Sequence, residues 1–459
     1  MFVCRQKEIK RINDFTSGKG AMIVYGLRRV GKTALIKKAL GDGGRKYVYF
    51  ECQKADEKTN VDLFVDLLQE SISFVDASFP TFLSVFKALE KSYRGYVFVI
   101  DEYSYMKEYY LESKKKESAM EAERIDSEFQ SIIDDHLGSN NLILSGSSIH
   151  IMEKLQDHGS PLYGRFADTI ALRQFTYLEA REMLPSLSYA DLIAFYGVFG
   201  GSPYVLEKID ESKSLEENVC ELILNEDGKL RNHLRANVIN ELESDPDLHR
   251  ILDAIRNGCK KYSEIESQAH ISTSGLLDKR LKKLLDLDII EVKYLVGKDE
   301  SSKKKYYEIK DNLLKFYYAY VFRQDSKIGF LGEKRFYELF VAPSIGTFLS
   351  RRFEGIVKSY FSESIKRGGG QDIMDIGTYL FDNNEYDCVL SKANGTHEIF
   401  EAKYYAKPMR REEMEKEIEQ IKAIKGLNVA RIGFVCNAGF QERLPGVSYI
   451  EMSDLFFGE

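Results

Sequence analysis

The chain has 459 residues, of which 44% are hydrophobic and 30% charged, and its formal net charge at pH 7 is −7. This length predicts roughly two to four domains with buried cores. The mild acidity argues against a non-specific polyanion binder but leaves a local basic face open. No apolar run approaches the roughly 18 residues of a membrane span, so we expect no membrane contact.

The cysteines and the amino terminus bear on the compartment. The first residues lack the apolar core of a signal peptide. The six cysteines are scattered without a CxxC pair, and the seven histidines are equally dispersed. This pattern favours a reducing environment and disfavours a structural zinc site. We therefore expect a cytoplasmic protein.

A glycine-rich loop stands out near the amino terminus. A lead-in helix with Ile9, Ile12 and Phe15 at helical spacing precedes an apolar strand at 22–25. The loop that follows fits the phosphate-loop pattern GxxxxGK[ST], and a helical pattern comes directly after it. Strand, loop and helix together are the context that this motif needs. The loop residues are Gly26, Leu27, Arg28, Arg29, Val30, Gly31, Lys32 and Thr33.

The residue types in this loop suit a nucleotide triphosphate. Gly26 and Gly31 let the backbone turn and approach the phosphates without a Cβ. The loop N–H groups and the helix N-terminus supply partial positive charge. Lys32 is expected to reach the β- and γ-phosphates, and the Thr33 hydroxyl to ligate Mg²⁺. The loop therefore predicts bound ATP with Mg²⁺.

Strands and helices alternate through the next hundred residues. We expect strands at 47–50, 96–100 and 142–144 and helices at 61–77 and 125–137, which predicts a parallel sheet with helices on both faces. The strand at 96–100 ends in Asp101 and Glu102, which should lie beside the phosphates. Asp101 is expected to hold Mg²⁺ through water, and Glu102 to orient and deprotonate the attacking water.

Two further polar positions have open roles. Ser145 and Ser147 end the strand at 142–144 and either sense the γ-phosphate or are an ordinary strand end. Arg165, in the loop Leu162-Tyr163-Gly164-Arg165, either reaches a nucleotide, in its own chain or a neighbouring subunit, or makes an ordinary salt bridge.

Beyond residue 176 the pattern becomes helical. Helices at 176–235 are interrupted by a loop at 199–203, and three short helices follow. The segment 262–285, with a turn at 272–275, resembles a helix-turn-helix, and strands at 289–292 and 306–309 around a charged loop would form a wing. The positive charges of its second helix either contact DNA or belong to a rigid spacer or protein-binding lid. They are Lys279, Arg280, Lys282 and Lys283.

The last third of the chain begins a new α/β pattern. Glu354 lies on a predicted helix, strands are expected at 378–381, 386–390 and 398–403, a charged helix at 411–424, and a final strand at 431–435. Asp387 lies in one strand, and Glu401 and Lys403 form a Glu-x-Lys motif fourteen residues later.

Six motifs occur in the order typical of one family. Over roughly residues 1–330 the chain resembles the archaeal-type ATPases of the AAA+-related STAND class (signal transduction ATPases with numerous domains). The family opens closer to F-x-G-R-E, whereas this chain has Cys4 and Gln6. The motifs are Phe2-Val3-Cys4-Arg5, the Tyr25 to Thr33 loop, Val99-Ile100-Asp101-Glu102, Leu144-Ser145-Gly146-Ser147, Ser160-Pro161-Leu162-Tyr163-Gly164-Arg165 and Gly200-Gly201-Ser202-Pro203.

The resemblance implies an architecture. It implies an AAA+-like P-loop NTPase core with a parallel five-stranded sheet, then a helical lid whose GxP motif touches nucleotide through Pro203, and a winged helix. The last third looks like the restriction-endonuclease-like domain often attached to these ATPases. The expected boundaries are 1–175 for the core, 176–238 for the lid, 239–312 for the winged helix, and 313–459 for bridging helices plus the C-terminal domain.

In active members of the restriction-endonuclease-like family, the Asp and Glu hold Mg²⁺ and the Lys polarises the attacking water. The resemblance carries these roles to Asp387, Glu401 and Lys403, and leaves open whether this domain cuts or only binds.

The sequence therefore predicts an Mg²⁺-dependent ATPase switch. Its nucleotide state would be relayed through the winged helix to a nuclease-like domain acting on or near DNA. The alternative is a non-catalytic regulator that holds ATP or ADP and scaffolds a partner protein. Both interpretations allow the protein to form a homo-oligomer or to bind a protein partner.

Overall fold

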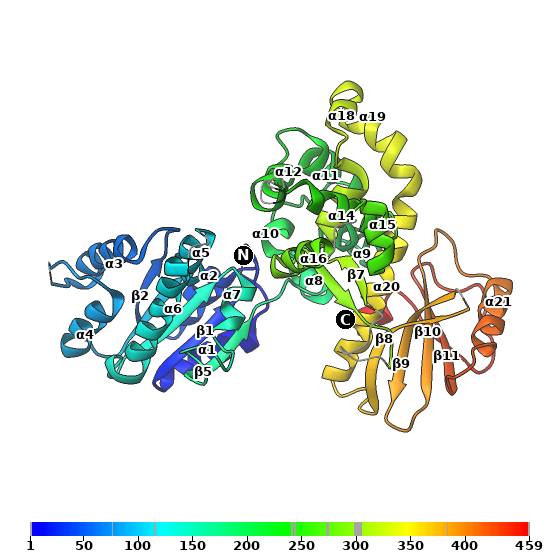
Figure 1. The fold of residues 1–459 in the computed structure, drawn as a ribbon. Coiled ribbons are helices and arrows are strands. Elements are labelled where there is room, and N and C mark those ends of the chain that lie inside the picture. The colour runs from blue at the N-terminus through cyan, green and yellow to red at the C-terminus, as the bar shows by residue number, and fades with distance from the viewer. Residues whose placement is uncertain are drawn as a thin grey trace. The chain divides into compact units, whose positions relative to one another are not determined.

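The computed structural model describes residues 2–75, 77–113, 116–239, 242, 245–271, 275–297, 305–382 and 384–457. The chain divides into two compact units, Met1–Gln174 and Phe175–Glu459 (Figure 1). Two sequence predictions fall partly outside the described residues, namely the helix-turn-helix turn at 272–274 and the wing loop at 298–304.

The first unit contains a parallel sheet of five strands in the order β2-β3-β4-β1-β5, which confirms the predicted fold class. No strand was predicted at the position of β5, because this edge strand buries only Ile170 fully and therefore lacks a continuous apolar run. The strands are β1 (Gly20–Tyr25), β2 (Lys46–Glu51), β3 (Tyr96–Asp101), β4 (Asn141–Gly146) and β5 (Phe166–Ala171).

Helices cover both faces of this sheet. The helix predicted at 61–77 was wrong at both ends: Asp56 accepts a hydrogen bond from Thr59 N and starts it early, and Ser73 ends it in a left-handed conformation. The helices are α1 (Gln6–Ser17), α2 (Lys32–Asp42), α3 (Glu57–Ile72), α4 (Phe82–Ser92), α5 (Tyr103–Glu112), α6 (Lys116–Ser131), the π-helical η1 (Ile132–His136) and α7 (Ile149–Lys154).

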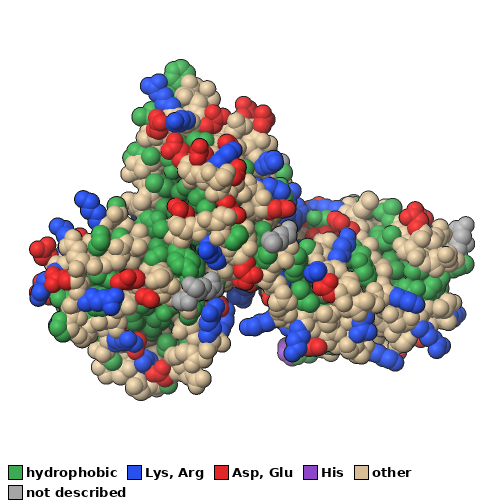
Figure 2. Space-filling model, turned by 180° about the vertical axis from the view of Figure 1, so that it is seen from behind, with side chains coloured by type: hydrophobic (Ala, Val, Ile, Leu, Met, Phe, Trp, Pro, Cys, Tyr) green, Lys and Arg blue, Asp and Glu red, His purple; other side chains and the backbone are tan. Residues whose placement is uncertain are grey.

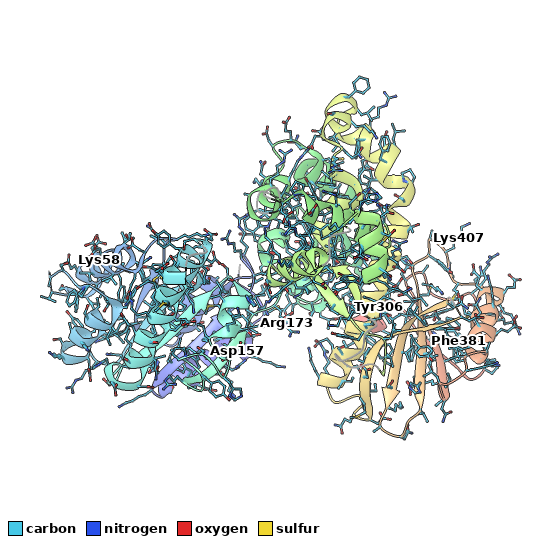
Figure 3. All side chains as sticks on the ribbon, viewed as in Figure 1. Lys58, Asp157, Arg173, Tyr306, Phe381 and Lys407 are labelled. Atoms are coloured by element: carbon cyan, nitrogen blue, oxygen red, sulfur yellow. The ribbon has the colours of Figure 1, made fainter. Side chains whose placement is uncertain are left out.

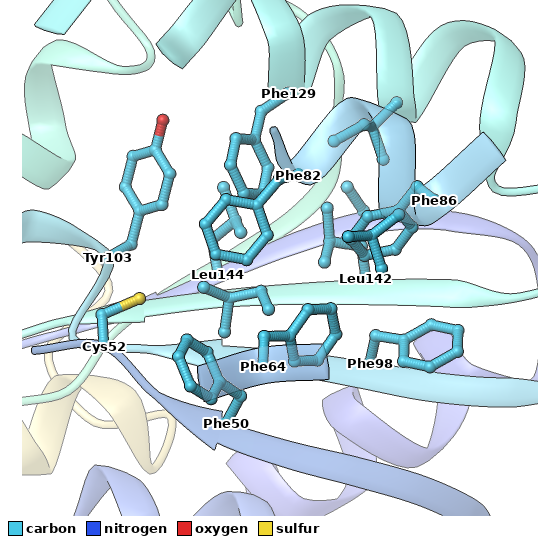
Figure 4. Close-up of a cluster of buried hydrophobic side chains, with 14 of the residues drawn as sticks. Phe50, Cys52, Phe64, Phe82, Phe86, Phe98, Tyr103, Phe129, Leu142 and Leu144 are labelled. Carbon is cyan, nitrogen blue, oxygen red and sulfur yellow. The ribbon is translucent and has the colours of Figure 1, made fainter. Parts of the chain in front are cut away.

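An aromatic cluster fixes one face of the sheet (Figure 4). Phe50 and Phe98 from the strands meet Phe64, Phe82 and other buried rings from the covering helices, with Phe64 and Phe82 centroids 5.7 Å apart. Each buried ring contributes roughly 1.5–3 kcal/mol. The opposite face packs on α1 and α2. This two-sided core holds the carboxyl ends of β1, β3 and β4 in one rigid edge.

The second unit opens with short helices, over the range 176–235 where the sequence predicted helices. The loop after α9 turns at Gly200 and Gly201, and Pro203 begins the next helix, where its missing N–H costs nothing. The elements are α8 (Tyr177–Met183), α9 (Tyr189–Phe199), α10 (Pro203–Leu206), α11 (Leu215–Val219), η2 (Cys220–Leu224), α12 (Lys229–Leu234) and η3 (Arg235–Ile239).

Three helices and an antiparallel ribbon follow, in the order of a winged helix. Tyr306, labelled in Figure 3, opens the second ribbon strand and bridges to Lys261. Arg280, on the predicted second helix of the helix-turn-helix, pairs with Asp245 at 2.7 Å, so one of the four cations of that helix is used inside the domain. The elements are α14 (Pro246–Arg256), α15 (Tyr262–Ala269), α16 (Leu276–Asp286), β6 (Ile290–Lys293) and β7 (Tyr306–Ile309).

Bridging helices lead into a mixed sheet with the order β12-β11-β10-β9-β8. The strand predicted to be last, at 431–435, is followed by a short, half-buried β12. The elements are α17 (Asn312–Phe316), η4 (Tyr317–Val321), α18 (Asp325–Leu331), α19 (Glu333–Phe336), η5 (Tyr337–Val341), α20 (Ala342–Lys366), β8 (Ile373–Phe381), β9 (Asn384–Lys392), β10 (His397–Lys403), α21 (Arg411–Lys422), β11 (Val429–Cys436), β12 (Val447–Ile450) and η6 (Asp454–Phe456).

The surface carries charges of both signs. Figure 2 shows Lys and Arg interspersed with Asp and Glu over the visible face. Within the described residues, no helix is both long enough and apolar enough to span a bilayer.

Candidate functional site

The phosphate loop joins β1 to α2 and depends on its two glycines. Gly26 has φ 155°, and a Cβ there would lie 2.1 Å from the Leu172 carbonyl oxygen. Gly31 has φ 96° and caps α2. Both positions therefore exclude a side chain for reasons of backbone geometry. The loop leads directly into the N-terminus of α2, where an anion is favoured.

Lys32 is buried at the start of α2. Its Nζ donates to the carbonyl oxygens of Gly26 at 2.9 Å and Leu27 at 3.2 Å, and lies 3.8 Å from Glu102 Oε1. Burial lowers the pKa of Lys32, and the carboxylates of Glu102 and Asp101 oppose that shift. The ammonium is thus held at the loop, next to the acidic end of β3.

Asp101 ends β3 with an exposure of only 2%. Its Oδ2 accepts hydrogen bonds from Thr33 Oγ1 at 3.0 Å and from the Tyr49 hydroxyl, and its Oδ1 accepts from Glu102 N at 2.9 Å. Tyr49 was missed in the sequence, because only the register of β2 against β3 brings its hydroxyl to this carboxylate. The burial of Tyr49 beside Asp101 raises the pKa of that phenol well above its usual range.

Thr33 and Asp101 fit the oxygen preference of Mg²⁺. The hydroxyl and the carboxylate already touch, and both lie next to the phosphate loop. These two side chains would hold the ion, which would supply charge neutralisation at the phosphates.

Glu102 adopts an unusual backbone conformation, with φ 50°, at the N-terminus of α5. Its Oε2 accepts two hydrogen bonds from Ser147, one from the backbone N at 2.9 Å and one from Oγ at 2.7 Å. Non-glycine residues in the left-handed region are enriched at functional sites. Ser147 therefore contacts the predicted general base, an arrangement that the sequence did not indicate.

The structure brings Ser145 to the sheet interior, not to the loop. Its hydroxyl is fully buried and, among the described residues, has no hydrogen-bond partner. Cys4 has φ 58°, a left-handed conformation at the position where the resembled family has glycine.

Arg165 lies at the opposite strand ends of the sheet from the phosphate loop of the same chain. It directly precedes β5, which runs parallel to β1 with Phe166 opposite Ala21 and Ala171 opposite Tyr25. The phosphate loop follows Tyr25, so it and Arg165 lie at opposite strand ends. Arg165 Nε pairs with Asp134 at 3.0 Å. The reading within one chain is therefore corrected, and a role at a neighbouring subunit stays a prediction.

The predicted lid contact has a strict backbone requirement. A Cβ on Gly201 would lie 1.9 Å from the Phe175 carbonyl oxygen, and Phe175 N donates to Gly201 O at 2.8 Å. Pro203 belongs to the second unit, and its contact with nucleotide stays a prediction.

A second acidic cluster forms in the C-terminal domain. Asp387 on β9 accepts a hydrogen bond from Ala402 N at 3.0 Å, which ties it to the Glu401–Lys403 motif on β10. Lys403 Nζ lies 3.1 Å from Glu401 Oε2 and 2.9 Å from Glu417 Oε1 of α21. Glu417 was not predicted, because only the packing of α21 on the sheet brings it to Lys403.

Burial raises the pKa values of carboxyl groups in and near this cluster. Burial and the nearby Asp387 raise the pKa of Glu401 to about 8, and the same two causes raise the pKa of Glu354 on α20 to about 7. Glu401 Oε1 is buried and has no hydrogen-bond partner among the described residues. Such an orphan oxygen suits a cation. However, in the described part of the chain no three Asp, Glu, His or Cys side chains are grouped closely enough to bind one metal.

The fold and the phosphate-loop geometry define an AAA+-like P-loop NTPase core. Residues 2–209 match a family described as an ATPase domain predominantly from Archaea, which confirms the archaeal-type ATPase resemblance over that range. Residues 317–419 match a second family, described as archaeal and bacterial proteins of unknown function. The second match spans Glu354, Asp387, Glu401 and Lys403.

Two similar proteins extend the comparison. The uncharacterized protein MJECL04 of Methanocaldococcus jannaschii is 26% identical over 407 residues, covering 87% of this chain and 86% of that protein. A Walker-type ATPase of Pyrococcus abyssi has a similar structure, with a TM-score of 0.52 and 16% identity over 69% of this chain and 96% of that chain. The second likeness supports the shared fold.

Proposed function

We propose that this protein is an Mg²⁺-dependent ATP-hydrolysing switch. The observation that carries the proposal is the joint placement of Lys32, Thr33, Asp101 and Glu102 at one sheet edge. Lys32 would bind the phosphates, Thr33 and Asp101 would hold Mg²⁺, and Glu102 would take a proton from the attacking water. The scattered spacing of the cysteines along the sequence, without a CxxC pair, supports a cytoplasmic setting.

Turnover in two variants tests this proposal. Lys32→Ala should abolish both ATP binding and hydrolysis, because it removes the phosphate contact. Glu102→Gln should keep ATP binding and lower hydrolysis by roughly a hundredfold, since only the general base is lost. Unchanged turnover in both variants would overturn the proposal. The Arg165→Gln variant adds a check on the neighbouring-subunit role, which requires its turnover defect to depend on protein concentration.

Helices of the proposed lid contact α20 and the last described residues of the chain. Gly197 of α9 leaves space for α20, since a Cβ there would lie 2.7 Å from Leu349 Cδ2. The Tyr177 hydroxyl of α8 donates to Leu455 O, and Phe456 stacks on Tyr189 with centroids 4.1 Å apart. These contacts support a relay from the lid through α20, which also carries Glu354, in addition to the predicted route through the winged helix.

For the C-terminal domain we infer metal-dependent cleavage of DNA. The carrying observation is the cluster of buried Glu401 with half-buried Asp387 and Lys403, in which one Glu401 oxygen has no hydrogen-bond partner among the described residues. Asp387 and Glu401 would hold Mg²⁺, and Lys403 would position the attacking water.

Cleavage of a labelled duplex with Mg²⁺ or Mn²⁺ tests this inference. Glu401→Gln should abolish the cleavage, while Glu398→Gln, on the same strand but paired with Lys392, should leave it unchanged. If the wild-type protein binds DNA without cutting it, the domain serves binding alone.

The alternative function is a regulator that holds nucleotide without turnover. The observation that favours it is the double hydrogen bond from Ser147 to Glu102, which restrains the expected base. Protein that co-purifies with ADP and hydrolyses ATP negligibly would support this alternative, and partner capture would then replace turnover as the activity to measure.

A further inference from the structure

The strand β9 carries one extra residue at the position of Asp387. The register of β8 against β9 shifts by one residue, so that Thr378 of β8 lies opposite two residues of β9, Asp387 and Cys388. Such a β-bulge bends its strand and changes the direction of its side chains, and bulges are common next to active sites. The regular pairs on either side of the shift are Gly377 with Val389 and Tyr379 with Tyr386.

At this bulge the side chain of Asp387 reaches β10. The regular pairing of β9 with β10 includes Cys388 opposite Phe400. Beside this pair, Asp387 Oδ2 accepts a hydrogen bond from Ala402 N at 3.0 Å, within the Glu401–Lys403 motif. The direction of the Asp387 carboxylate therefore depends on the backbone geometry of the bulge.

Thr378, the residue opposite the bulge, is bonded to two other elements. Its Oγ1 accepts a hydrogen bond from Lys358 Nζ of α20 at 2.7 Å. Its carbonyl oxygen accepts a hydrogen bond from Val296 N, in the segment that follows β6, at 3.0 Å. Thr378 therefore links α20 and the winged-helix segment to the backbone beside Asp387.

Lys358 also belongs to the surroundings of the acidic cluster. It is half-buried and lies one helical turn after Glu354 on α20, so both side chains project from the same face of that helix. Burial and Asp387 raise the pKa of Glu354 to about 7, and Lys358 opposes this rise. Burial also raises the pKa of Asp387, and Lys403 and Lys358 oppose it. The hydrogen bond to Thr378 thus fixes an ammonium whose charge acts on both carboxylates.

We propose that Lys358 is a positioning residue for the acidic cluster of the C-terminal domain. Through its hydrogen bond to Thr378 it fixes the β8–β9 bulge that directs the Asp387 carboxylate to β10. The inference rests on the proposed DNA cleavage for its role in catalysis, whereas the arrangement itself needs neither metal nor DNA.

Hydrogen exchange of the Ala402 amide tests this arrangement directly, because that N–H donates to Asp387. Exchange is measured on the full-length protein, at single residues, by mass spectrometry with electron-transfer fragmentation. Lys358→Met keeps the apolar stem and removes the donor, whereas Thr378→Val keeps the β-branched shape and removes the acceptor. In each variant the Ala402 amide should exchange about tenfold faster, since its acceptor is no longer held in place.

Two controls separate positioning from general stability. The amide of Phe434, in the buried part of β11, should change its exchange rate by less than about twofold in both variants. Lys366→Met, which replaces an exposed Lys at the end of the same helix, should leave both amides as in the wild type. An unchanged Ala402 amide in both variants, or equal acceleration at Ala402 and Phe434, would overturn the proposal.

The double variant of Lys358 and Thr378 tests whether the two residues act through one bond. Its effect on the Ala402 amide should be no larger than that of either single variant, because the second change then removes nothing further. Additive effects would show that the two residues act independently and would contradict the proposal.

Calorimetric titration with Mn²⁺ distinguishes this proposal from the proposed cleavage. Thr378→Val leaves every charge in place and should weaken Mn²⁺ binding by about tenfold, because it releases a ligand from its support. Tighter binding in Lys358→Met with unchanged binding in Thr378→Val would show that Lys358 only repels the ion, and the proposal would be wrong. If the wild type neither binds Mn²⁺ nor cuts a labelled duplex while the Ala402 amide responds as expected, the cleavage function fails and the positioning of Asp387 stands.

Discussion

At the scale of single residues, the ATP site is held together by side chains outside the motifs. Asp101 receives hydrogen bonds from Thr33, from Tyr49 and from the backbone of Glu102. Hydrogen bonds to a carboxylate favour its charged form. The metal-binding role proposed for Asp101 therefore draws on Tyr49, whose hydroxyl orients the carboxylate from the neighbouring strand.

Replacing Ser147 gives a prediction in which the direction of the change in ATP turnover distinguishes two roles of its hydroxyl. Ser147→Ala removes one of two hydrogen bonds on Glu102 Oε2. Because a hydrogen bond to a charged group is worth roughly 1.5–3 kcal/mol, freeing the base should raise basal ATP turnover by about two- to tenfold. A steady-state phosphate-release assay measures this, with Ser145→Ala as the unchanged control. A fall in turnover for Ser147→Ala would instead favour the γ-phosphate contact expected from the sequence.

Glu354 gives a pH prediction. Its pKa in the folded protein is about 7, raised by burial and by Asp387, and lies above the usual value of about 4.3 for an exposed Glu. The folded state therefore binds more protons between these values, so the stabilisation from this proton is complete below the lower pKa and is lost as pH rises toward 7. Above that pH, Glu354→Gln should be more stable than the wild type by roughly 1–3 kcal/mol.

Unfolding of both proteins from pH 4 to 8 in the presence of a chelator measures this difference. A gap that stays constant across the range would show that Glu354 does not titrate as a buried carboxyl.

At the scale of elements, the lid loop depends on one close backbone contact. Gly201→Ala would drive a Cβ into the Phe175 carbonyl oxygen and should destabilise the second unit by about 2 kcal/mol or more. Gly329→Ala, in the helix α18 with open space around the new methyl, should be neutral or stabilising by roughly 0.5–1 kcal/mol. Chemical unfolding of the two variants measures both effects. Equal stability in both would refute the steric account.

The segment that follows β6 of the winged-helix ribbon contacts the C-terminal sheet. Val296 N donates to Thr378 O at 3.0 Å, and the Val296 side chain is buried with Tyr386 and Val389 of the C-terminal sheet. Lys260, before α15, pairs with Glu385 at 3.4 Å. The residues that leave β6 therefore extend the edge of β8. This placement ties the winged helix to the domain that carries Asp387.

At the scale of the whole second unit, the chain end joins the lid to α20. Phe456 is fully buried against Tyr177 and Tyr189, while Phe457 stacks on Tyr360 of α20. Phe456→Ala should lower the stability of this unit by about 3–5 kcal/mol, since it leaves a large cavity. Phe330→Ala is the matched control, because that ring is 87% exposed and should cost little.

Limited proteolysis together with thermal unfolding measures the effect of Phe456→Ala. Cleavage between α9 and α20 should accelerate in this variant. Identical proteolysis in the Phe456 and Phe330 variants would show that the chain end does not join these elements.

Local sequence was enough for much of the first unit. The phosphate loop, the acidic end of β3 and the buried strands were predicted because each depends on residues that are consecutive in the sequence. The half-exposed β5 was not predicted, because it lacks an apolar run. The capped α4 was overlooked, although Phe82, Val85, Phe86 and Leu89 follow helical spacing after the Thr81–Ser84 capping box. In the C-terminal domain the motif residues were predicted, whereas Glu417, the partner of Lys403, was not.

The sequence by itself determined the chemistry available to this protein, namely a phosphate loop, a pair of carboxylates and a Glu-x-Lys motif in predictable elements. Tertiary structure alone decided which groups act on these residues. It brought Ser147 and Tyr49 to the acidic pair, and it placed Arg165 at the strand ends opposite to the phosphate loop. The physical reason is that strand register and helix packing are set by burial across the whole core, which no local pattern encodes.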